Sequence, residues 1–350
     1  MQKLNTFTLI IVTLLMSTLS IAQPMPNLHK GVSLSNWFWN QTKPFDAETW
    51  ITKQDYDWIK NHGYDHIRIP VDMEQLDQDW LIPKLRQAIQ WGVDIDLVVI
   101  ISCFGDEYNT HLIPQERYHQ KLGQLAKIIA AFPKDKVLFQ FANEPDVPDP
   151  KTWSRIQSEM ILEVRKYLPD RWILTSTPLR WRQIDGWDQI KAFSLMTPSA
   201  DQQVIYTLYF YEPFFFTHQG ASWSGNEAKH VKGHRYPSNA LTSQTVISSL
   251  PKDLPEWLPQ TLAEGWDKNR LAEKLKPVIA WRDSFERPIM ISEIGVHRPY
   301  APKESTQNWL KDVQSLLDHH QIPYTLWDYR GNFSIRWDDP NFVIPKDSYN

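Results

Sequence analysis

The feature that most constrains this chain is an alternation between short apolar runs, rich in β-forming residues, and longer stretches with helical periodicity. The apolar runs cover residues 31–34, 66–69, 97–101, 137–141, 172–175, 203–208, 288–292 and 323–326. Their interiors are almost continuously apolar, which is typical of strands that are buried on both faces of a parallel sheet. The sequence therefore favours an α/β architecture with helices covering the strands.

The helical stretches support this interpretation. Leu122, Leu125 and Ile129 recur on one helical face, and Asp149 followed by Pro150 is a typical helix start. Eight strands alternating with helices, with no composition shift between them, predict a single-domain (β/α)8 TIM barrel.

Two segments depart from the regular repeat. Residues 212–265, after the sixth run, are too many for an ordinary βα loop and are expected to fold over the mouth of the barrel. After Trp327 no convincing amphipathic helix follows. The barrel therefore either lacks a regular eighth helix or has its bottom closed by a segment near the N-terminus.

The first 22 residues have the features of a secretory signal peptide. Lys3 begins a short basic region, residues 7–19 are apolar but short for a membrane span, and Ser20 and Ala22 suit positions −3 and −1 of a cleavage site. We expect residues 1–22 to be removed and residues 23–350 to form the mature domain, secreted or periplasmic. An uncleaved membrane anchor is the alternative, and no later stretch resembles a transmembrane helix.

The net charge, the single cysteine and the histidine spacing argue against several kinds of partner and site. A formal net charge of −4 offers no basic surface for nucleic acid or anionic lipid. Cys103 has no intrachain partner, so no disulfide framework is expected. The group His230, Lys232, His234 and Arg235 has no carboxylate or cysteine at ligand spacing, and we interpret it as a solvated loop rather than a metal site. The sequence indicates no cofactor and leaves the oligomeric state open.

Two glutamates follow apolar runs and carry the predicted chemistry. Glu144 comes just after the fourth run, and Glu293 comes directly after the seventh. Active sites of (β/α)8 barrels lie at the carboxyl ends of the strands, and two carboxyl groups about 5–5.5 Å apart can cleave a glycosidic bond with retention. Glu144 has no cation next to it, which suits the proton donor. Glu293 must stay ionised, and Arg68 and Tyr211 are candidates to stabilise its charge.

The ordered set of motifs resembles glycoside hydrolase family 5, the cellulase-like family of clan A, over nearly all of the mature chain. The motifs are Arg68 in Ile-Arg-Ile-Pro-Val, Asn143 and Glu144 in Asn-Glu-Pro, Tyr211 before Glu-Pro-Phe, Glu293 in Ser-Glu-Ile-Gly and Trp327 in Leu-Trp-Asp-Tyr. The resemblance implies a retaining barrel enzyme that needs no metal, with Glu144 as acid/base and Glu293 as nucleophile. It also implies that Arg68 and Tyr211 position Glu293, that Asn143 binds the sugar 2-hydroxyl, and that Trp327 forms the platform under the reacting sugar.

The chain departs from the family pattern at two histidine positions. Cys103 and Phe104 stand at the end of the third strand, and Tyr209 stands two residues before Tyr211. Tyrosine can donate a hydrogen bond but cannot titrate near neutral pH, so Tyr209 is expected to bind substrate without tuning the acid. His111 or His218 could occupy the space of a missing imidazole.

Aromatic residues make up 13% of the chain, and some of them are candidate sugar platforms. Trp37 is expected to contact substrate. Trp39, Trp181, Phe214 and Trp223 are further candidates, and burial in the core is the alternative for each of them.

The sequence as a whole predicts a secreted glycosidase that acts on a β-linked polysaccharide or oligosaccharide, a β-glucan or a mannan. Two alternatives remain open. A carbohydrate-binding pseudoenzyme would keep the cleft and lack turnover, and a transglycosylase acting on cell-envelope glycan would share the covalent intermediate. The sugar, the linkage, and endo or exo action are not specified by the sequence.

Overall fold

The computed structural model describes residues 24–39, 47–105, 115–147, 149–178, 180–181 and 188–336. Within these residues, eight parallel strands close into a barrel in the order β1-β10-β9-β8-β6-β4-β3-β2. The strands are β1 (Lys30–Ser33), β2 (His66–Asp72), β3 (Val98–Phe104), β4 (Val137–Gln140), β6 (Ile173–Ser176), β8 (Val204–Tyr209), β9 (Ile289–Ile294) and β10 (Tyr324–Leu326). Each predicted run overlaps one of these strands, and the predicted (β/α)8 barrel is confirmed.

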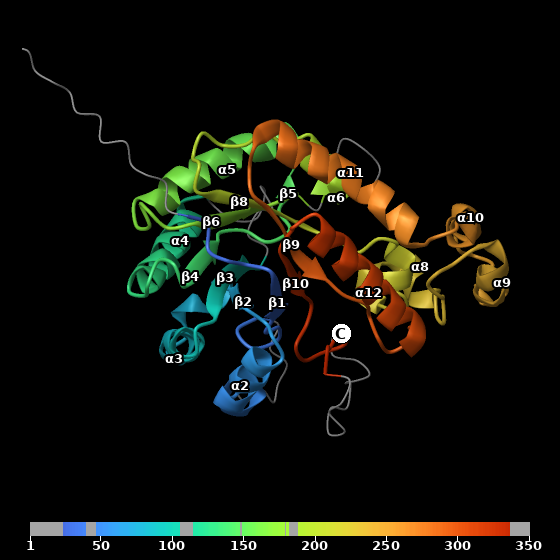
Figure 1. The fold of residues 1–350 in the computed structure, drawn as a ribbon, viewed down its shortest axis with the longest axis horizontal. Helices are drawn as coiled ribbons and strands as arrows, with labels where there is room; N and C mark the ends of the chain where they lie inside the picture. The colour runs from blue at the N-terminus through green and yellow to red at the C-terminus, as the bar shows by residue number, and fades with distance from the viewer. Residues whose placement is uncertain are drawn as a thin grey trace, which may run out of the picture.

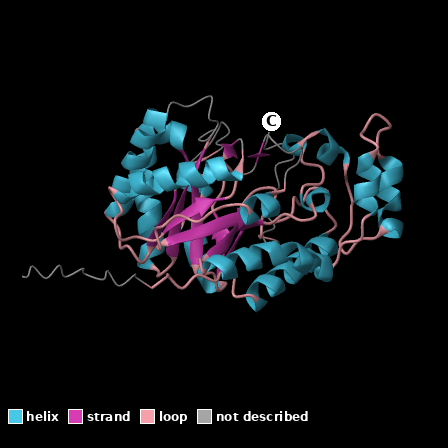
Figure 2. Ribbon diagram, turned by 90° about the horizontal axis from the view of Figure 1, so that it is seen from above, coloured by secondary structure: helices cyan, strands magenta, loops and turns pink. Residues whose placement is uncertain are grey.

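Helices surround the barrel, as Figures 1 and 2 show. They are α1 (Ala47–Trp50), α2 (Lys53–Asn61), α3 (Leu81–Asp94), α4 (Gln115–Ala130), α5 (Pro150–Arg165), α6 (Gln189–Ser194), α11 (Lys268–Phe285) and α12 (Lys303–His319), with a 3-10 helix η1 (Met73–Asp77) after β2. Asp149 caps α5 by accepting hydrogen bonds from the backbone N–H groups of Lys151 and Thr152, so the predicted helix start is confirmed. Among the described residues no helix follows β10.

Strand residues alternate between two apolar clusters. Val99, Ile101 and Phe139 belong to the large core shared with the helices. Ile100 and Leu138, one position away, belong to a second cluster, which places them inside the barrel. The members of this inner cluster are Leu28, Val98, Ile100, Leu138, Trp172, Leu174, Ile205 and Met290. Each barrel strand that contributes does so from its amino-terminal half, so the cluster fills the bottom of the barrel.

The segment before β1 closes that bottom. Leu28 is buried in the inner cluster, and the carbonyl of Pro24 accepts a hydrogen bond of 3.1 Å from the indole of Trp172. The structure thus contains both of the features left open by the sequence, a closing N-terminal segment and the lack of a helix after β10 in the described chain. The predicted signal peptide, residues 1–22, lies outside the described residues.

The long segment between β8 and α11 is an insertion with short helices of its own. They are α7 (Phe214–Thr217), η2 (Ser222–Ser224), α8 (Asn226–His230), α9 (Ala240–Ser249) and α10 (Trp257–Ala263). α9 and α10 pack around a separate apolar cluster of Val231, Val246, Leu258 and Leu262. In Figure 1 they lie beyond α8, outside the ring of helices. Tyr211, at the start of the segment, joins the aromatic cluster of the site described below, and for the rest of the segment the expected cover over the mouth stays a prediction.

Candidate active site

The two candidate glutamates lie at the carboxyl ends of β4 and β9. Glu293 is in β9 and is 6% exposed. Glu144 follows β4 and is partly buried. Its φ of 44° is in the left-handed region, which costs a non-glycine residue of order 1 kcal/mol and persists where the surroundings hold it. The Glu144 N–H donates a hydrogen bond of 3.0 Å to the hydroxyl of Tyr209, so the backbone that carries this glutamate is fixed from β8.

Arg68 connects the strands that carry the site. Its guanidinium is fully buried and donates to Glu293 Oε1 at 2.7 Å, to Asn143 Oδ1 at 2.7 Å and to Ser102 Oγ at 3.0 Å. Its Nε donates to Gln140 Oε1 at 2.8 Å. A buried guanidinium with this many hydrogen bonds is a rigid support, because each bond fixes the plane of the group. The predicted role of Arg68 next to Glu293 agrees with this geometry.

A polar layer lies under the site and above the apolar inner cluster. Gln140 Oε1 accepts from both Arg68 and Ser102, and Gln140 Nε2 donates to Ser176 Oγ at 2.8 Å and Thr207 Oγ1 at 3.1 Å. All four hydrogen bonds that this amide can make are therefore formed. The sequence analysis missed Gln140. A polar residue inside the otherwise apolar fourth run was the available signal.

Tyr209, the last residue of β8, and Tyr211, just after it, make hydrogen bonds to different partners. The Tyr211 hydroxyl donates to Glu293 Oε2 at 2.9 Å, as predicted for a residue that positions this carboxylate. The Tyr209 hydroxyl donates to Asn143 Oδ1 at 2.8 Å and accepts from the Glu144 N–H. Tyr209 is only 3% exposed and its hydroxyl is engaged by the protein. We therefore assign Tyr209 to positioning Asn143 and Glu144 rather than to substrate contact.

Burial and neighbouring charges give the carboxyl groups of Glu144 and Glu293 different pKa values. Desolvation, followed by the negative charge of Glu293, raises the pKa of Glu144 to about 8, and Arg68 only partly opposes this. Desolvation also raises the pKa of Glu293, but Arg68 and the Tyr211 hydrogen bond both lower it. Since Glu144 lacks those two hydrogen bonds, Glu293 ionises first. Glu144 therefore holds its proton more tightly than Glu293 does.

An aromatic cluster borders the glutamates. Trp327 is 7% exposed and lies parallel to Phe104 with ring centroids 5.9 Å apart. Trp39, which is partly exposed, packs against both rings at 4.9 and 6.0 Å. Phe333, from the turns after β10, and Tyr211 complete this cluster. Phe104 and Phe333 were not predicted as site residues. The Arg68 guanidinium lies 5.0 Å from the Phe104 ring, so Phe104 occupies space above the polar layer.

Trp37 does not belong to the site. It is fully buried and packs against Phe38 at 4.7 Å and against Tyr56 of α2 and Trp91 of α3 at 6.4 Å. No part of its ring is available to a sugar, so the expectation that Trp37 binds substrate is corrected. The side chain of Trp181 and the whole of His111 lie outside what the structure describes.

His218 lies beside the site. Its ring is 4.8 Å from Tyr211 and 5.6 Å from Phe333. Burial, with a smaller effect from His297, lowers the pKa of His218 to about 3, so the imidazole is neutral. It contacts the tyrosine that holds Glu293 rather than the neighbourhood of Glu144. His218 therefore does not replace an imidazole next to the candidate acid.

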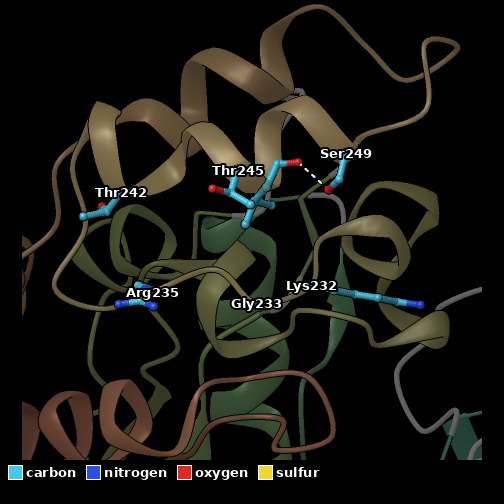
Figure 3. A pocket seen from close by; sticks show the side chains of 7 residues that line it. Lys232, Gly233, Arg235, Thr242, Thr245 and Ser249 are labelled. Atoms are coloured by element: carbon cyan, nitrogen blue, oxygen red, sulfur yellow. Dashed lines mark hydrogen bonds between the residues drawn. The ribbon is translucent and has the colours of Figure 1, made fainter.

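The basic group in the insertion is only partly solvated. Lys232 and Arg235 are exposed, as predicted, whereas His234 is 2% exposed, and its backbone N–H donates to Gln219 Oε1. A pocket of about 240 Å³ lies there (Figure 3), and it is lined by Lys232, Gly233, Arg235, Thr242, Thr245, Val246 and Ser249, so that neither glutamate borders it.

In the described chain no three His, Cys, Asp or Glu side chains are placed to hold a metal ion. None of the described helices combines the length and the apolar character that a membrane span needs.

Comparison with known proteins points to one family of glycosyl hydrolases. The family model for cellulase (glycosyl hydrolase family 5) matches residues 24–333. Endoglucanase 3 of Fibrobacter succinogenes is 25% identical over 341 residues, 89% of this chain and 51% of that protein, so the chain spans about half of it. Endoglucanase C of Acetivibrio thermocellus is 23% identical over 327 residues, 87% of this chain and 92% of that protein.

Solved structures share the fold. Endoglucanase Cel5A from Thermotoga maritima superimposes with a TM-score of 0.69 at 21% identity, covering 88% of this chain and 91% of that one. The cellulose synthase subunit Z of Clostridioides difficile gives a TM-score of 0.68 at 19% identity, covering 88% and 94%.

Proposed function

Because the chain belongs to glycosyl hydrolase family 5, the cellulase family, and is therefore a glycosidase, we propose that it hydrolyses a β-glucan with retention of configuration. Glu144 is the acid/base and Glu293 the nucleophile. One observation carries these roles: Arg68 and Tyr211 donate hydrogen bonds to Glu293, while Glu144 is left neutral beside it. A double displacement needs that asymmetry, since one carboxyl group must attack and the other must give a proton.

The first step forms a covalent intermediate. A Glu293 carboxylate oxygen bonds to the anomeric carbon as the glycosidic C–O bond breaks, and Glu144 gives its proton to the departing oxygen. The sugar is then an ester of Glu293, and Glu144 is a carboxylate. Arg68 and Tyr211 remain in contact with the two oxygens of Glu293 and fix the direction of attack.

The second step reverses the proton transfer. Once Glu293 is esterified it is uncharged, so one of the two effects that raised the pKa of Glu144 disappears. Glu144 becomes more acidic at that point, which suits a carboxylate acting as a base. It removes a proton from water, the water oxygen bonds to the anomeric carbon, and Glu293 leaves as a carboxylate. Both groups return to their starting protonation states.

Substrate contacts follow from the remaining side chains. Asn143 Oδ1 already accepts hydrogen bonds from Arg68 and Tyr209, which leaves its Nδ2 free to donate to a sugar hydroxyl. Trp327 and the more exposed Trp39 form the aromatic platform for the reacting sugar. A β-glucan is the proposed substrate because several similar proteins are named endoglucanases, and β-mannan is the comparison substrate.

We also propose that residues 1–22 act as a signal peptide and that the enzyme works outside the cytoplasm. N-terminal sequencing of exported protein tests this. A chain that still begins with residues 1–22 contradicts it.

Substitution of the two glutamates tests the mechanism. Glu293→Gln should lower kcat on β-glucan by about 10³-fold or more with the fold intact, because the attacking carboxylate is gone. Glu144→Ala should lower it by about 10²–10⁴-fold on β-glucan and much less on aryl glycosides, whose leaving groups need little protonation. Glu74→Gln, a change in an exposed residue after β2, is the control and should leave kcat unchanged.

Azide and product analysis complete the test. With Glu144→Ala, azide should give a glycosyl azide of retained configuration, and with Glu293→Ala one of inverted configuration. The opposite stereochemistry would exchange the two roles. Binding of glucan and mannan without release of reducing sugar would favour a carbohydrate-binding pseudoenzyme, and products longer than the substrate would indicate a transglycosylase.

A further inference from the structure

Four of the five large exposed aromatic residues of the described chain lie on or beside the insertion. In the described chain the exposed large aromatic residues are Phe214, Trp223, Trp257, Phe285 and Tyr300. Phe214, Trp223 and Trp257 are part of the insertion. Tyr300 follows β9 and contacts it, since its carbonyl accepts from the Gly233 N–H and its ring lies 4.4 Å from Lys232 Nζ. Exposed aromatic surface concentrated in one region is a common feature of binding sites.

The exposed rings of Trp223 and Tyr300 both contact the buried ring of His297. We define the outer aromatic strip as Trp223, His297 and Tyr300. Trp223 is 5.0 Å from His297, and His297 is 5.6 Å from Phe333, measured between ring centroids. Phe333 is in turn 6.1 Å from Tyr211, which holds the proposed nucleophile. A continuous series of ring contacts therefore leads from the reacting glutamate to an exposed tryptophan.

The supports of the strip are rigid. His297 is 2% exposed, and its Nδ1 lies 2.8 Å from the Gln219 carbonyl. A carbonyl only accepts, so Nδ1 carries the proton. Burial lowers the pKa of His297 to about 4, which leaves the ring neutral near pH 7.

The exposed rings of Trp223 and Tyr300 each pack against a neighbouring part of the protein. Trp223 meets the His297 ring edge-on at 87°, and the Tyr300 ring lies so close to Gly220 that a side chain there would be 2.0 Å from it. Rings that are already fixed lose little conformational entropy when a ligand binds.

The chemistry of the strip fits a sugar chain. A pyranose ring has apolar C–H faces and polar edges, and it gains from stacking on an exposed tryptophan face such as that of Trp223, which is 43% exposed. Lys232, over Tyr300, adds a hydrogen-bond donor at the edge. A chain held at Glu144 and Glu293 has further sugar units on both sides, and the strip is joined to that site through the ring of Phe333.

We propose that the outer aromatic strip binds sugar units of the glycan that lie beyond those held at the two glutamates, with Trp223 as the main platform, so that the enzyme prefers long chains to short ones. This inference rests on the proposed function for the identity of the glycan. Trp223 acts on substrate affinity and is not part of the reacting group.

Trp223→Ala tests the strip against a matched control. Its kcat/KM on a hexasaccharide of the hydrolysed glycan should fall about tenfold, equivalent to about 1.4 kcal/mol, mainly through KM. Its kcat/KM on an aryl disaccharide should stay within twofold of the unmodified enzyme. Trp257→Ala is the control, since Trp257 is 48% exposed in the same insertion but packs on Phe215 at 5.8 Å. It should change neither value.

Trp223→Phe, which keeps an aromatic face, should restore most of the loss and guards against a folding defect in the alanine variant. An equal loss on both substrates, or no loss on the hexasaccharide, would overturn the proposal. So would a loss in Trp257→Ala as large as in Trp223→Ala.

A binding measurement separates this inference from the proposed function. In the Glu293→Gln background, calorimetry with gluco- and manno-hexasaccharides should show affinity that falls about tenfold when Trp223 is also replaced by alanine. That result would support the strip even if the unmodified enzyme hydrolysed neither sugar. If hydrolysis is observed and binding does not depend on Trp223, the proposed function stands and the strip is wrong.

Discussion

At the scale of single residues, Tyr209 shows how Glu144, the proposed acid, is held by a side chain that does not titrate near neutral pH. Its hydroxyl holds the Asn143 side chain and the Glu144 backbone but makes no hydrogen bond to the Glu144 carboxyl group in the described contacts. Burial and the Glu293 charge then set the pKa of Glu144 to about 8. The proposed proton donor is thus given its raised pKa by burial and by a neighbouring charge.

This pKa predicts an alkaline limb in the pH dependence. As pH rises through about 8, Glu144 loses the proton that it must donate, so kcat/KM on β-glucan should fall with an apparent pKa near 8. The Glu144→Ala enzyme, measured with an activated aryl glycoside, should lack this limb. If the limb persisted in that variant, another group would have to be responsible for it.

At the scale of elements, five strands meet in the polar layer around Gln140. Arg68 comes from β2, Ser102 from β3, Ser176 from β6 and Thr207 from β8, and each makes a hydrogen bond with the Gln140 amide of β4. The layer separates the apolar bottom of the barrel from the charged site. Its hydrogen bonds fix the carboxyl ends of the strands, so that side chains beyond them keep their relative positions.

Gln140→Leu should therefore reduce both stability and activity. The leucine leaves Arg68 Nε and three hydroxyl groups without this partner inside the barrel, which should lower the free energy of unfolding by about 2–4 kcal/mol. Urea denaturation and kcat on β-glucan measure the two effects.

Gln157→Leu is the matched control for the same change. Gln157 is equally buried but lies on α5, where it accepts from Thr175 Oγ1. The Gln157→Leu enzyme should have a lower free energy of unfolding and an unchanged kcat. A Gln140→Leu enzyme with normal kcat would show that the polar layer supports the fold alone.

Much of this arrangement was predictable, because buried parallel strands leave apolar runs and the reacting residues follow the strands. The order of Arg68, Asn143, Glu144, Tyr211 and Glu293 along the chain was enough to place them at one end of the barrel. The roles of the two glutamates stay predictions until they are tested.

Side-chain direction in irregular segments was not predictable. Trp37 and Trp39 would face the same way in a strand. In the turns after β1, however, Trp37 is buried against α2 and α3, whereas Trp39 joins the aromatic cluster that borders the glutamates. Phe333 comes from turns that no periodic pattern marks. Gln140 acquires its importance only from four neighbours on four other strands.

At the scale of the whole molecule, buried ionisable groups link stability to pH. Asp328, next to Trp327, is fully buried, and desolvation raises its pKa to about 8 even though Ser35 donates a hydrogen bond to it. Its pKa in the unfolded chain is about 3.9. Between these two values the folded protein binds a proton that the unfolded chain has lost, so the contribution of Asp328 to stability decreases as pH rises.

Asp328→Asn should remove this dependence. Asparagine keeps an acceptor for Ser35 and does not titrate, so the loss of unfolding free energy between pH 5 and pH 8 should be smaller in the variant by a few kcal/mol. Buried His234 and His297, whose pKa values are lowered to about 4, act in the opposite direction at acidic pH and are common to both proteins. Thermal or urea unfolding at the two pH values measures the difference. Identical pH dependence would mean that Asp328 is ionised in the folded state.

The separate apolar cluster under α9 and α10 has an evolutionary consequence. Since Val231, Val246, Leu258 and Leu262 hold that helical hairpin together without the barrel core, mutations that reshape it carry little penalty for the strands. Natural selection can therefore alter this part of the periphery while the barrel and its polar layer stay intact. Variation among close homologues should then accumulate in the hairpin faster than in the barrel.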